Sequence, residues 1–122
     1  MLKLLIVDDA PFIREIVKQA VVGSAIELVG EASDGEEAVA MAKAKNPDVI
    51  LMDMIMPRKN GIDAAIEILK NNPGAKILAF STVDQESMVK KAMDAGCCGY
   101  LNKPFTQDDL LKAINKSGGR NG

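Results

Sequence analysis

Val49-Ile50-Leu51-Met52, followed directly by Asp53, is the most apolar run in the sequence that has the length of a β-strand. A strand with apolar residues at every position is buried on both faces, as in parallel sheets that carry helices on each side. We therefore predict that residues 49–52 form the central strand of such a sheet and that Asp53 stands at its carboxyl end.

Strand-like and helix-like segments alternate on both sides of this run. Four more apolar segments have the pattern of buried strands, at residues 4–7, 27–32, 76–80 and 98–101. Apolar residues at helical spacing fill the intervals. In the first interval Ile16 is predicted to face the core and Arg14 to face solvent. Five strands that alternate with five helices require a parallel sheet covered on both faces, so the predicted fold class is α/β.

Residues that start and end helices support these boundaries. Pro11 suits the first turn of the first helix, and Gly23 suits its end. Asp34 and Thr106 are predicted N-caps of the second and fifth helices. We assign residues 1–117 to one domain and the Gly-rich residues 118–122 to a flexible tail or linker stub.

The composition excludes several classes of chemistry. The chain has 122 residues, 48% of them apolar and 26% charged, which fits one domain with its own core. Its 15 Lys and Arg against 17 Asp and Glu give a net charge of −2, which argues against direct nucleic-acid binding by this domain. The absence of His excludes a Ser-His-Asp triad, a His general base and His-ligated zinc.

Two features favour a cytoplasmic protein with no membrane segment. The apolar run at the amino terminus is broken by Asp8-Asp9 and is too short for a signal peptide or a membrane span. Cys97 and Cys98 are neighbours, which suits reduced thiols better than a disulfide framework. We expect both cysteines to be small buried packing residues.

Polar residues follow four of the predicted strands, at the edge where α/β sheets bind ligands. They are Asp8-Asp9, Asp53, Ser81-Thr82 and Asn102-Lys103. Each has an ordinary explanation when taken alone: the aspartates as helix caps or turn residues, the hydroxyls as partners of local backbone, the lysine as a solvated side chain. Together they predict a phosphate site with a cation, because crowded carboxylates attract one. Oxygen ligands without imidazole or thiolate favour Mg²⁺ or Mn²⁺.

The order and spacing of these residues resemble the receiver domain of two-component response regulators over essentially the whole chain. The resemblance is carried by Ile6-Val7-Asp8-Asp9, Leu51-Met52-Asp53-Met54-Ile55-Met56-Pro57 with Asn60-Gly61, Ser81, Gly99-Tyr100 and Lys103-Pro104-Phe105. It implies a flavodoxin-like (βα)5 doubly wound fold with the strand order 2-1-3-4-5. It also implies a regulatory phosphoacceptor, which assists its own phosphorylation and dephosphorylation but turns over no separate substrate.

The same resemblance implies a role for each site residue. Asp53 accepts a phosphoryl group from a sensor histidine kinase or a phosphotransfer protein. Four ligands are assigned to Mg²⁺, which Mn²⁺ can replace: Asp8, Asp9, Asp53 and the backbone carbonyl of Ile55. Three side chains are assigned to the phosphoryl group: Lys103, Ser81 and Thr82.

The switch and the output are also implied by the resemblance. Ser81 and Tyr100 form the switch, in which Ser81 moves toward the modified Asp53 and Tyr100 turns inward. The peptide bond between Lys103 and Pro104 is expected to be cis. A downstream target protein is expected to bind the fourth helix, fifth strand and fifth helix, and the protein is expected to be a monomer or a dimer that forms on phosphorylation.

Other interpretations fit these residues less well. Phosphohydrolases with an Asp nucleophile usually place two Asp two residues apart after the first strand, whereas Asp8 and Asp9 are adjacent. A nucleotide-binding module would have a Gly-rich phosphate loop there, and none is present. The complete set of polar residues argues against a degenerate receiver that serves only as a scaffold. Two outputs stay open: a single-domain regulator of the chemotaxis type, which we favour, or an N-terminal receiver of a multidomain DNA-binding transcription regulator.

Overall fold

Strands and helices alternate along the chain, as the apolar patterns predict. The computed structural model describes all residues except 57, 82–85, 104 and 119–122. Within the described residues the elements are β1 (Leu2–Val7), α1 (Pro11–Val21), β2 (Ile26–Ala32), α2 (Gly35–Lys45), β3 (Val49–Asp53), α3 (Gly61–Asn71), β4 (Ile77–Ser81), α4 (Glu86–Asp94), β5 (Gly99–Asn102) and α5 (Gln107–Ser117). The strands form one parallel sheet in the order β2-β1-β3-β4-β5, which confirms the predicted fold class and topology.

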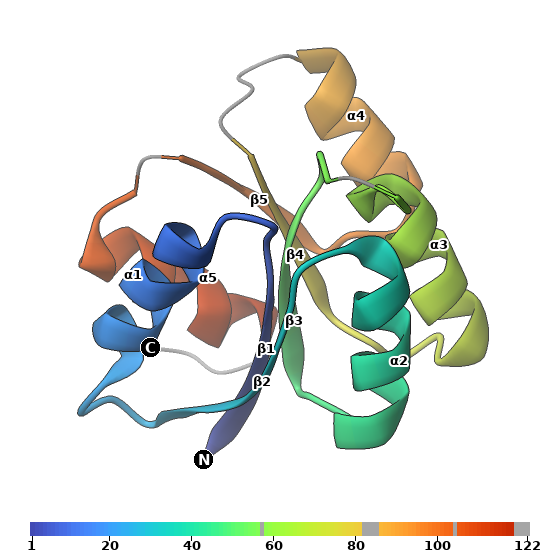
Figure 1. Ribbon diagram of the computed structural model, residues 1–122. Helices are drawn as coiled ribbons and strands as arrows, with labels where there is room; N and C mark the ends of the chain where they lie inside the picture. The colour runs from blue at the N-terminus through green and yellow to red at the C-terminus, as the bar shows by residue number, and fades with distance from the viewer. Residues whose placement is uncertain (57, 82–85, 104, 119–122) are drawn as a thin grey trace.

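The sheet separates two apolar layers, because residues along each strand alternate between its faces. In β3, Ile50 and Met52 pack on the side of α2, α3 and α4, and Val49 and Leu51 pack on the side of α1 and α5 (Figure 1). The first layer is rich in Met and Ala, whereas the second consists mainly of Leu, Ile, Val and Phe. All residues of β3 are buried, which confirms that it is a central strand.

Two of the predicted caps are present, and a third candidate is absent. The Asp34 carboxylate accepts a hydrogen bond from the backbone N–H of Glu37, and the Thr106 hydroxyl accepts one from Asp109. The N-cap of α1 is Ala10, without a side-chain cap. Asp8 therefore does not cap α1, although its carboxylate does accept a hydrogen bond from the Ala10 N–H at 2.8 Å.

The structure corrects three expectations from the sequence. Ile16 is 48% exposed, because α1 packs through the narrower stripe that contains Val17 and Val21. Arg14 does not face solvent but bonds to groups at the ends of β1 and β2. Cys97 is buried as expected, but Cys98 is exposed.

Two further predictions concern the carboxyl-terminal tail and membrane segments. The helix α5 ends at Ser117, and residues 119–122 of the predicted tail lie outside the described residues. Among the described residues, none of the helices has the length and apolar character needed to cross a bilayer.

Close backbone contacts fix the loop between β3 and α3. The N–H of Gly61 donates to the carbonyl of Met54 at 3.1 Å, and the N–H of Gly35 donates to the carbonyl of Lys59 at 2.9 Å. A Cβ atom at Gly61 would overlap the carbonyl oxygen of Asp53, and one at Gly35 would overlap that of Lys59. Only glycine permits this approach, so the loop that follows Asp53 is held against the amino-terminal ends of α2 and α3.

We expect Gly61→Ala to lower the free energy of unfolding by roughly 2–3 kcal/mol, because the added methyl group must push backbone aside. Urea denaturation measures this loss. Gly74→Ala is the matched control, since its Cβ would make only an ordinary contact with the Asn72 side chain. Equal effects of the two substitutions would contradict the close approach at Gly61.

Cys97 and Cys98 are expected to differ in reactivity. Burial, with a smaller contribution from the neighbouring Cys98, raises the pKa of the Cys97 thiol to about 12, so almost no thiolate forms at pH 8. Iodoacetamide should therefore modify the folded protein once, at Cys98, and the urea-unfolded protein twice. Intact mass and peptide mapping check this result, and rapid modification of Cys97 in the folded protein would contradict it.

Candidate functional site

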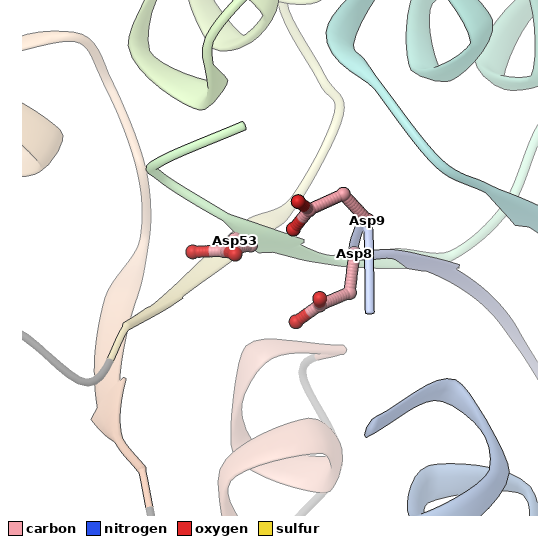
Figure 2. A group of neighbouring side chains, drawn as sticks. All are labelled: Asp8, Asp9 and Asp53. Carbon is pink, nitrogen blue, oxygen red and sulfur yellow. The ribbon is translucent and has the colours of Figure 1, made fainter. Parts of the chain in front are cut away.

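Three carboxylates meet at the carboxyl ends of β1 and β3. Parallel pairing places Val7 beside Met52, so Asp8 and Asp9 emerge next to Asp53. Each of the three side chains offers an oxygen atom, and these atoms lie within 4.8 Å of one another (Figure 2). The predicted acidic cluster is therefore present in the structure.

The three carboxylates differ in burial. Asp8 and Asp53 are 1% and 6% exposed, whereas Asp9 faces solvent. Burial raises the pKa of the Asp53 carboxyl group above its ordinary value, and the negative charge of Asp8 adds to this increase. The backbone N–H of Ile55, 3.2 Å from Asp53 Oδ1, and the Lys103 ammonium group offset part of it.

Lys103 places one positive charge inside the acidic cluster. Its Nζ atom lies 2.6 Å from Asp8 Oδ2 and 3.5 Å from Asp53 Oδ2, and its side chain is 9% exposed. The backbone N–H of Lys103 donates to the Ser81 carbonyl at 2.9 Å, so the pairing of β4 and β5 extends to this residue. The sequence predicted that Lys103 belongs to the site, but not that its ammonium group bonds most closely to Asp8.

Sequence reasoning missed a second cation beside the cluster. Arg14 Nη1 donates to the backbone carbonyl of Asp8 at 2.7 Å, and Arg14 Nε donates to Glu31 at 3.1 Å. Lys18 also contacts Glu31, at 2.7 Å. Arg14 therefore links the start of α1 to the ends of β1 and β2. The available signal was its place one turn into the helix that follows Asp8-Asp9, with Glu31 at the end of the next strand.

Sequence reasoning also missed the aromatic ring of Phe80. It lies one residue before Ser81 on β4 and is fully buried, and Lys103 Nζ lies 4.4 Å from its centroid. A large aromatic residue next to a predicted site residue was the available signal.

The remaining predicted residues differ in how closely the structure associates them with this cluster. Ser81 ends β4 and is 1% exposed, and Tyr100 on β5 is half-buried against the Met- and Ala-rich layer. Ile55 donates its N–H to Asp53, while the role of its carbonyl as a ligand stays a prediction. Thr82 and Pro104, with the expected cis bond, lie outside the described residues.

The donor atoms of the cluster fit Mg²⁺ or Mn²⁺. They are carboxylate oxygens, which are hard ligands, and the three acids outnumber the single ammonium group at the site. Asp9 faces solvent, which leaves a side of the cluster open to a hydrated ion.

The strand order and the acidic strand ends place the chain in the flavodoxin-like class of doubly wound α/β domains. Within that class it belongs to the family of response regulator receiver domains, whose model matches residues 4–115.

Comparison with individual proteins agrees with this assignment. The chain is 43% identical to the chemotaxis protein CheY of Thermotoga maritima over 114 residues, which are 93% of this chain and 95% of that protein. The receiver domain of the response regulator NarL from Mycobacterium tuberculosis superposes with a TM-score of 0.93 at 31% identity, covering 97% of this chain and 96% of that one. CheY in the CheX-CheY-BeF3-Mg²⁺ complex of Borrelia burgdorferi superposes with a TM-score of 0.89 at 27% identity, covering 94% and 87%. The chain is thus a receiver of the two-component type, a class of signalling regulators.

We expect Lys103→Met to strengthen Mn²⁺ binding about three- to tenfold. The ammonium group of Lys103 repels a second cation and forms an ion pair with Asp8, which is one of the expected ligands. Isothermal titration calorimetry on the unphosphorylated protein measures the affinity. Lys112→Met is the control, since Lys112 pairs with Asp108 on the exposed surface of α5. Weaker or unchanged binding in Lys103→Met would show that Lys103 does not compete for the carboxylates.

Proposed function

We propose that Asp53 accepts a phosphoryl group from the phosphohistidine of a sensor kinase or phosphotransfer protein, in a Mg²⁺-dependent reaction. An Asp53 carboxylate oxygen forms a bond to phosphorus while the bond between phosphorus and the imidazole nitrogen breaks. The displaced imidazole stays with the partner protein, and the phosphoryl group stays on Asp53 as an acyl phosphate.

The position of Asp53 carries this proposal. It ends a central strand at the carboxyl edge of the sheet, with Asp8, Asp9 and Lys103 around it. The Ile55 N–H contacts Oδ1, which holds the carboxylate in one orientation.

Asp8, Asp9 and Asp53 would hold Mg²⁺, with the Ile55 carbonyl as a further ligand. When bound, the ion neutralises oxygen charge on the phosphoryl group as it approaches the carboxylates. The CheX-CheY complex of Borrelia burgdorferi was solved with Mg²⁺ and BeF3, which supports a Mg²⁺ ion in a domain of this kind.

Lys103 supplies a positive charge to the site in addition to that of the Mg²⁺ ion. Its ammonium group is already within 3.5 Å of Asp53 Oδ2, so it is placed to contact a phosphoryl oxygen on that carboxylate. Ser81 ends β4, the strand next to β3, and its hydroxyl group would donate to the same phosphoryl group, as would that of Thr82, the next residue in the sequence.

The output would follow from linked changes at Ser81 and Tyr100. A phosphoryl group on Asp53 gives the Ser81 hydroxyl a new partner, and Tyr100 can then pack more deeply against the Met- and Ala-rich layer. The target protein would bind the surface of α4, β5 and α5. We favour a single-domain cytoplasmic regulator of the chemotaxis type, supported by the likeness to CheY over nearly its full length. A receiver that belongs to a DNA-binding regulator is the alternative.

Incubation with acetyl phosphate and Mg²⁺ should add one phosphoryl group, detected by intact mass. EDTA and the substitution Asp53→Asn should each abolish the adduct, because one removes the ion and the other the nucleophile. Asp63→Asn is the matched control, since Asp63 is an exposed acid in the first turn of α3. A full adduct on Asp53→Asn would assign the phosphoacceptor to another residue.

A further inference from the structure

The side chain of Lys103 rests on an aromatic ring as well as on carboxylates. Its Nζ atom lies 4.4 Å from the centroid of the Phe80 ring. Phe80 is fully buried, and its alternation along β4 directs it into the layer formed with α1 and α5. Its ring also packs at a tilt of 53° against Phe105, with 6.3 Å between the centroids. The ring is therefore held in place by the core and not by Lys103.

The contacts of Lys103 differ in how they respond to a divalent cation. Asp8 and Asp53, its two ion-pair partners, belong to the carboxylate cluster that fits Mg²⁺. A cation bound to those oxygens neutralises their negative charge and repels the ammonium group, so both ion pairs of Lys103 are weakened. The face of a Phe ring is not a ligand for a hard cation, but it does attract an ammonium group through its quadrupole.

We propose that Phe80 is a positioning residue for Lys103, which keeps the ammonium group at the site when a divalent cation occupies the carboxylates. The ring face and the carboxylates hold Lys103 in the metal-free protein, and the ring face holds it in the metal-bound protein. The functional part of this inference rests on the proposed function, in which Lys103 contacts the phosphoryl group on Asp53.

The geometry is tested first by NMR, on protein labelled with ¹³C-lysine and saturated with Mg²⁺. A ring face above which Lys103 lies shifts its ¹Hε resonances upfield of those of the other lysines, and Lys103→Met identifies the signal. We expect the upfield shift to disappear in Phe80→Leu and to persist in Phe105→Leu, which alters the same core without removing the ring that faces Lys103. An unshifted Lys103 signal in the wild-type protein with Mg²⁺ bound would overturn the proposal, whatever the stability of the variants.

The consequence for the reaction is tested by a double-mutant cycle. At saturating Mg²⁺, Phe80→Leu should slow phosphorylation by acetyl phosphate about three- to tenfold, the size of effect expected from a desolvated cation–π contact. In the Lys103→Met background the same substitution should change the rate by less than about twofold, because the side chain that Phe80 positions is gone. Equal effects in both backgrounds would mean that Phe80 acts only through core packing, which overturns the proposal.

The two measurements also separate this proposal from the proposed function. If wild-type protein takes up no phosphoryl group, the phosphoacceptor role of Asp53 fails, and the Lys103 signal alone decides whether Phe80 positions the ammonium group. If the adduct forms normally but the Lys103 signal is unshifted, only the role of Phe80 fails.

Discussion

The site depends on the parallel pairing of β1 with β3. This pairing places Asp8 and Asp9 beside Asp53, where three carboxylates repel one another and two of them are removed from water. Buried carboxylates require a counter-charge, and Lys103 provides it from the far side of β4. The sheet thus brings together charged groups from distant parts of the sequence, and each offsets part of the cost of burying the others.

The ion pair between Lys103 and Asp8 also means that the site is ordered before any ligand arrives. Arg14 holds the Asp8 carbonyl, Ile55 holds the Asp53 carboxylate, and Phe80 lies under the Lys103 ammonium group. Under the proposed function, a cation and a phosphoryl group would replace these pairs at a site whose side chains are already in position. Lys103 would also compete with the ion for Asp8, because its ammonium group must move away before that carboxylate can bind a metal.

The sequence patterns were sufficient for the alternation of strands and helices and for the residues that end strands, whereas the strand order was predicted from the resemblance to receiver domains. Asp8, Asp53 and Lys103 follow apolar strands, and parallel strands bring their carboxyl ends to one edge. The patterns were insufficient for Arg14 and Phe80, whose roles depend on how side chains reach between elements. The exposure of Ile16 was missed for a related reason: periodicity shows which side of a helix is apolar but not how much of that side the neighbouring elements cover. Cys98 was expected to be buried from its residue type alone, which does not show that it lies just before β5 and is exposed.

The two apolar layers on either side of the sheet give the domain an uneven mechanical character. Phe80, Leu110 and Ile114 belong to the layer under α1 and α5, where branched and aromatic side chains have few alternative rotamers. Met52, Met54 and Met56 belong to the opposite layer, where unbranched thioethers can change rotamer and still fill the space. Tyr100 packs on this Met- and Ala-rich layer, whereas Lys103 is supported by Phe80 of the opposite layer. The sheet therefore separates a stiff layer, which supports Lys103, from a more compliant one, which can repack around Tyr100.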